Sequence, residues 1–187
     1  MNRIYFISLI FFALSALSYS VVRWHQAKNQ DNQVTRFTMT PDFIAESLKS
    51  KIYDKLGKLF YIIDAKQMEH YAKTEVTYFE LPKYTLYPKN SINPWKISAN
   101  KGTLDNNNRV KLEDRVSLKA TDSDSLIQEI HGKYLELDLN TNIISSEQTI
   151  YIKGKGFTIY GSGLIVDLNT KQMTLKQHVQ TTYKNTK

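Results

Sequence analysis

Apolar and polar residues alternate along most of the chain beyond residue 41. The two-residue period is that of a β-strand with one buried face, and the segments are rich in β-branched and aromatic residues. Clusters of Asn, Asp and Gly separate them, as at Asp105–Asn108 and Asn140–Asn142. Residues 42–50 fit either a short helix or an irregular edge. The pattern predicts an all-β body over residues 42–187, with the alternation clearest at Val110/Leu112, Val116/Leu118, Leu135/Leu137/Leu139, Ile150/Ile152, Phe157/Ile159, Leu164/Val166/Leu168, Met173/Leu175 and Val179/Thr181/Tyr183.

A tripeptide of Ile, any residue, then Ala or Gly recurs at spacings of 34, 33 and 29 residues: Ile63–Ala65, Ile97–Ala99, Ile130–Gly132 and Ile159–Gly161. A second element, Leu137–Thr141, matches Val166–Thr170 at the same offset of 29. A period near 30 predicts stacked layers of short strands, one layer per repeat. The alternative is chance similarity in a β protein rich in Gly and Asn turns.

Small residues in these repeats predict bends or bulges where a side chain would clash with the neighbouring layer. The predicted structural positions are Ala65, Ala99, Gly132, Gly154 and Gly161. Both Gly pairs, Gly154/Gly156 and Gly161/Gly163, are interpreted as turns at strand ends.

The segment Ile4–Val22 contains 19 residues and no charge. As a helix it would span about 28 Å, close to the hydrocarbon thickness of a bilayer. Trp24 follows, where an aromatic ring favours the interface. The sequence therefore predicts a transmembrane anchor over residues 1–24 and a polar tether over 25–41. A cleaved signal ending near Ser18–Ser20 is the alternative. Flanking charges choose no firm orientation, although the short leader favours a cytoplasmic N-terminus.

The predicted strands leave one apolar face on each sheet, and no amphipathic helix is available to cover it. Two sheets must then cover each other. Full closure would give an ordinary packed core, whereas splaying at one edge would give an apolar groove. The pattern alone leaves both open.

Candidate chemistry is sparse. The formal net charge of +7 is a mild excess with both signs mixed along the chain. The four histidines lie far apart, cysteine is absent, and no phosphate-binding loop or nucleophile motif occurs. Asp122–Ser125 reads as an exposed turn rather than a calcium loop. We therefore expect no enzyme, no cofactor, no metal site and no binding of nucleic acid.

The order of several segments resembles the LptC family of lipopolysaccharide export. These segments are Leu59–Ala65, Val76–Pro82, Trp95–Ala99, Val110–Leu112, Val116–Leu118, Ile152–Gly154, Gly161–Leu164 and Val179–Tyr183. The resemblance implies an open, twisted β-jellyroll (a β-taco, or OstA-like fold) after one membrane helix. It implies a single-pass protein of the cell inner membrane with its C-terminal domain in the periplasm. It also implies that the protein accepts lipopolysaccharide from an ATP-driven LptBFG-type transporter, against which its helix packs, and passes the lipid to an LptA-type periplasmic bridge protein.

The resemblance further implies a lipid-binding groove and a partner-docking edge. The expected groove residues are Tyr61, Phe79, Trp95, Ile97, Ile152, Met173 and Tyr183, and each is otherwise a plain core residue. The expected docking edge contains Val179, Thr181 and Tyr183. Two other readings remain: a membrane-anchored envelope scaffold with a closed β core and no lipid, and a soluble periplasmic carrier released by signal cleavage.

Overall fold

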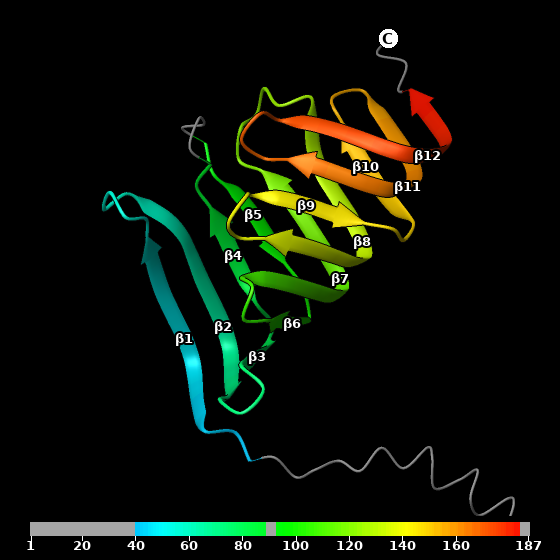
Figure 1. Ribbon diagram of the computed structural model, residues 1–187. Helices are drawn as coiled ribbons and strands as arrows, with labels where there is room; N and C mark the ends of the chain where they lie inside the picture. Colours follow the sequence, from blue (N-terminus) through cyan, green and yellow to red (C-terminus); the bar gives the residue numbers. More distant parts are fainter. Residues whose placement is uncertain (1–39, 89–92, 184–187) are drawn as a thin grey trace, which may run out of the picture. The chain divides into compact units, whose positions relative to one another are not determined.

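The computed structural model describes residues 40–88 and 93–183, and these residues form twelve β-strands (Figure 1). The all-β prediction is confirmed, and residues 43–50 belong to an edge strand that bends at Ser47, which agrees with an irregular edge and not with a helix. The strands are β1 (Phe43–Tyr53), β2 (Leu59–Tyr71), β3 (Val76–Glu80), β4 (Lys83–Leu86), β5 (Trp95–Ser98), β6 (Lys101–Leu104), β7 (Arg109–Ala120), β8 (Ile127–Asp138), β9 (Ile143–Ser146), β10 (Ile150–Gly154), β11 (Phe157–Asp167) and β12 (Gln172–Tyr183).

The predicted anchor and nearly all of the predicted tether lie outside the described residues. Across residues 40–88 and 93–183, no helix has the length and apolar character needed to cross a membrane. All described residues after Thr40 belong to one compact unit.

The strands form one antiparallel network that folds into two facing sheets. Long strands contribute one half to each sheet, and short strands belong to one sheet only. The first sheet runs β1–β2–β4–β5–β7–β8–β10–β11–β12. The second runs β1–β2–β3–β6–β7–β8–β9–β11–β12. Each edge strand, β1 and β12, starts in the second sheet and ends in the first, and the two lie at opposite ends of the stack (Figure 1).

Every passage between the sheets occurs along one line, which we call the bend line. On β7 the pairing with β8 shifts between Glu113 and Val116, and the two intervening residues have positive φ. Ser47 on β1 has φ 52°, and Leu81 between β3 and β4 has φ 50°. Left-handed conformations of this kind turn the strand sharply.

The repeat interpretation is confirmed by the position of the tripeptides. Their isoleucines lie in one row of the first sheet, because Ile97 and Ile130 both pair with Leu118 while Ile130 and Ile159 both pair with Ile152. The small residue that ends each tripeptide lies at the bend line. One repeat therefore corresponds to one layer of the stack.

Steric crowding explains the glycines of the later layers. A Cβ on Gly161 would lie 2.6 Å from the backbone oxygen of Gln177, and one on Gly132 would lie 3.2 Å from Ile150 Cγ2. A Cβ on Gly154 would overlap the Phe157 ring. One interpretation was wrong: Gly161 and Gly163 lie inside β11, not at its end, and bend the strand there, with φ 67° at Gly163.

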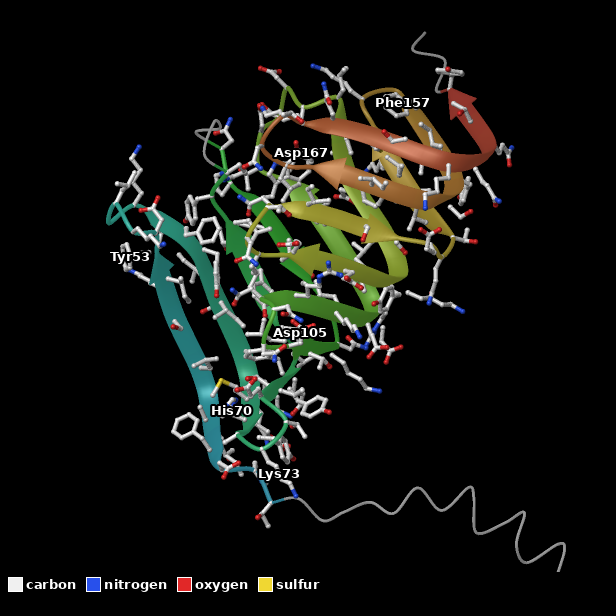
Figure 2. All side chains as sticks on the ribbon, in the orientation of Figure 1. Tyr53, His70, Lys73, Asp105, Phe157 and Asp167 are labelled. Carbon is white, nitrogen blue, oxygen red and sulfur yellow. The ribbon has the colours of Figure 1, made fainter. Side chains whose placement is uncertain are left out.

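Opposite the bend line lies the turn side, where each sheet ends in a series of turns. In the second sheet these turns stack on one another through asparagine. Asn108 Nδ2 donates to Asn140 Oδ1 at 3.1 Å, and Asn142 Nδ2 donates to Asn169 Oδ1 at 3.2 Å. Asp105 and Asp167, labelled in Figure 2, begin two of these turns, and each accepts backbone N–H groups from its own turn.

Candidate functional site

The seven predicted groove residues all lie on inward-facing positions of the two sheets. In the first sheet, Tyr61 and Trp95 both pair with Leu86, and Ile97 and Ile152 belong to the neighbouring row. Phe79 pairs with Met68 in the second sheet, and Met173 pairs there with Val166. Tyr183 pairs with Phe157 near the end of β12. The structure thus brings them to one interior, spread along its length rather than gathered in one cluster.

A single inward row crosses the first sheet from β2 to β12. Each member pairs with the next across the strands, and all but two are aliphatic. The row is Ile63, Tyr84, Ile97, Leu118, Ile130, Ile152, Ile159 and Thr181. Because side chains of paired residues lie on the same face, this row gives the first sheet a continuous, mainly apolar inner surface along the stack.

Burial is complete in the middle of the stack and decreases toward both ends. Ile97 is 1% exposed and Ile152 is 0% exposed. Tyr61 and Met173, nearer the two edges, are half-buried, and Tyr183 at the end of β12 is 76% exposed. The sheets therefore pack closely at their centre and leave apolar side chains accessible at each end.

The predicted docking edge lies on β12, which pairs with β11 and with no other strand in residues 40–88 and 93–183. Thr181 pairs with Ile159 and Tyr183 with Phe157, so both residues continue the inward rows. Val179 falls where the β11–β12 register shifts, between Tyr160 and Gly161. Sheet edges of this kind can accept a further strand.

On the turn side, an ion pair joins the two sheets. Lys171 belongs to the turn between β11 and β12, and Asp122 to the turn between β7 and β8. The Lys171 Nζ atom lies 3.3 Å from Asp122 Oδ2. The backbone N–H of Asp124, together with Lys171, holds the pKa of Asp122 below its usual range. Sequence reasoning identified the Asp122 turn but missed this contact, since nothing local links residues 49 positions apart.

Asp122→Asn is expected to destabilise the chain slightly at neutral pH and not at all in acid. The folded pKa of Asp122 is depressed, so its stabilising contribution is present above its unfolded pKa and is lost as pH falls through the folded value. Chemical denaturation of the full chain in detergent at both pH values measures this. Asp124→Asn is the matched control, because Asp124 contacts Lys155 instead. If Asp122→Asn lowered the free energy of unfolding equally at neutral and at acidic pH, the prediction would be wrong.

Comparisons with known proteins identify the family of the chain. The chain matches the family described as "Lipopolysaccharide-assembly, LptC-related" over residues 8–184. It is 29% identical to the lipopolysaccharide export system protein LptC of Haemophilus influenzae, with 93% of each chain covered. It is 27% identical to the protein of that name from Escherichia coli K12, covering 83% of this chain and 82% of the relative. Since the family match takes in nearly the whole sequence, the chain belongs to the LptC-related family of lipopolysaccharide-assembly proteins.

Proposed function

We propose that this protein carries lipopolysaccharide through the cell envelope. It accepts the lipid from an inner-membrane, ATP-driven transporter of the LptBFG type and passes it to a periplasmic bridge protein of the LptA type. The single observation that carries the proposal is the apolar row of the first sheet, which runs from β2 to the edge strand β12. Membership of the LptC-related family supports it.

Acyl chains need such an interior because each CH₂ group exposed to water costs about 0.8 kcal/mol. Several long chains therefore cannot cross the periplasm without a cover. If the two sheets separate along the turn side, the sugars can stay hydrated while the chains lie between the sheets.

Lipid entry requires the two sheets to separate where they now pack. The half-buried ends separate most easily, since Tyr61 and Met68 near β1 and Met173 near β12 already contact solvent. Farther in, Ile130 and Ile152 are fully buried, and the Asp122–Lys171 pair holds the turn side together. Lipid chains entering from an end would replace protein contacts with chain contacts of the same apolar kind.

The proposal places residues 4–22 across the inner membrane as a single pass, with the β-domain in the periplasm. The helix then positions the β1 end of the domain beside the transporter that loads it. This arrangement rests on the apolar run of the sequence and on family membership.

A photocrosslinking amino acid at Phe79 is expected to capture lipopolysaccharide during active transport. Phe79 is buried and faces the interior, and its ring meets that of Tyr84 edge-on at 6.4 Å. Membranes containing the transporter, supplied with ATP, give the active condition. The adduct is measured by immunoblotting for lipopolysaccharide linked to the chain.

Tyr78 provides the matched control, because this neighbouring residue of the same strand faces outward and is 48% exposed. A crosslinker there should capture no lipid. A second candidate function, the anchored scaffold with a closed core, is favoured by the complete burial of Ile130, Leu137 and Ile152. Absence of lipid adducts at both positions during active transport would support the scaffold and refute the carrier.

A further inference from the structure

Tyr84 has an unusual place in the apolar row. Its side chain is 1% exposed, and its hydroxyl has no hydrogen-bond partner among the described residues. Its ring lies between aromatic neighbours, 6.1 Å from the Tyr61 centroid and 6.4 Å from that of Phe79. Burial raises the pKa of this phenol, so it stays protonated and able to donate.

An unpartnered hydroxyl destabilises a buried site. Folding removes the water that hydrogen-bonded to the hydroxyl and supplies no protein partner in its place. Phenylalanine would fill the same space among Tyr61, Phe79 and Ile97 without that cost. A tyrosine here is therefore explained if its hydroxyl has a partner in some other state of the protein.

The position of Tyr84 suggests what brings that partner. Tyr84 lies on β4, which pairs with β2, the strand next to the free edge β1. On that side Ile63, which pairs with Tyr84, is buried, whereas the inward residues Leu48, Ile52 and Tyr61 are half-buried. A ligand that enters between the sheets from this end meets the Tyr84 hydroxyl before it reaches the closely packed centre.

We propose that the Tyr84 hydroxyl donates a hydrogen bond to the carbonyl oxygen that joins an acyl chain to its headgroup. Hydrocarbon offers no acceptor, so within an acylated lipid the ester or amide carbonyl is the acceptor nearest the chains. The bond fixes how deep the chain sits: the carbonyl stops beside Tyr84, and the chain continues past Ile97 toward the centre. This inference rests on the proposed lipid-carrying function.

Ser117 supplies a control from the same structure. Its hydroxyl is also buried without a partner among the described residues. Ser117 pairs with His131, however, on the outward face of the first sheet, so it does not border the interior. Ser117→Ala removes an orphaned hydroxyl outside the proposed lipid path, whereas Tyr84→Phe removes one inside it.

The test uses full-length chains in detergent and measures thermal unfolding without lipid, then binding of purified lipopolysaccharide. Tyr84→Phe is expected to unfold at a higher temperature than the parent and to bind lipopolysaccharide about three- to tenfold more weakly, the loss of one neutral hydrogen bond. Ser117→Ala should also unfold at a higher temperature while binding with unchanged affinity.

Each other outcome is decisive. If the parent binds lipopolysaccharide and Tyr84→Phe binds equally well, the hydrogen bond does not exist, although the carrier function stands. If Tyr84→Phe unfolds at a lower temperature than the parent, the hydroxyl has a partner in the empty chain and the inference fails. If the parent itself binds no lipopolysaccharide, the proposed function fails with it.

Discussion

Proline at Thr181 is expected to abolish docking of the periplasmic bridge protein while the membrane complex still assembles. Thr181 lies within β12, which pairs with no described strand other than β11, and we propose that an incoming strand pairs along its other side. Proline has no backbone N–H, and its ring restricts φ, so it interrupts a ladder wherever it is placed. Whether the lost N–H points toward β11 or toward the partner, this end of the strand no longer presents a regular edge.

Co-purification of the bridge protein with Thr181→Pro measures the effect, and co-purification of the transporter tests assembly. Thr181→Val is the matched control, since valine keeps the backbone N–H and the branched shape and should dock normally. Full recovery of the bridge protein with the proline variant would show that docking does not use this strand.

Alanine at Gly161 is expected to reduce the free energy of unfolding by about 1–3 kcal/mol, the usual effect of forcing extra atoms into a packed site. The added Cβ would lie 2.6 Å from the backbone oxygen of Gln177. Because that atom belongs to the main chain of β12, rotating a side chain cannot relieve the clash. The β11–β12 pair must shift at the point where its register already changes.

Gly132→Ala makes the matched comparison at the equivalent position of the preceding layer. There the nearest atom is a side-chain methyl group, Ile150 Cγ2, at 3.2 Å, which can move by a few tenths of an ångström. Chemical denaturation of both variants should therefore rank Gly161→Ala as clearly less stable. Equal stability would mean that the bend at Gly161 tolerates a side chain.

The local sequence is sufficient to predict the strands and their arrangement in repeated layers. The two-residue alternation at Leu135, Leu137 and Leu139 corresponds to an inward face that is almost completely buried. The tripeptide repeat marks the bend line, because a Cβ on Gly132 or Gly161 would crowd atoms of the neighbouring strand. These features depend on contacts that recur in every layer, so they leave a periodic trace in the sequence.

Features that occur once left no such trace. The pair Gly161 and Gly163 predicts a turn at a strand end, whereas in the structure the bend occurs inside β11. Contact between Asp122 and Lys171 and the orphaned hydroxyl of Tyr84 depend on how the two sheets face each other. Sequence reasoning also left open whether the interior is closed, and the structure shows close packing at the centre with accessible ends.

The edge strands β1 and β12 of the described residues point the same way, and this affects how a second domain could pair with either of them. Both β1 and β12 run from the second sheet to the first. All strand pairs of the described residues are antiparallel. If a similarly folded domain continued both sheets from head to tail, its first edge strand would lie beside β12 and run in the same direction. Such a joint is parallel, and parallel pairing is slightly less stable per residue than antiparallel pairing. Residue for residue, a joint of this kind would therefore be weaker than the strand pairs inside either domain.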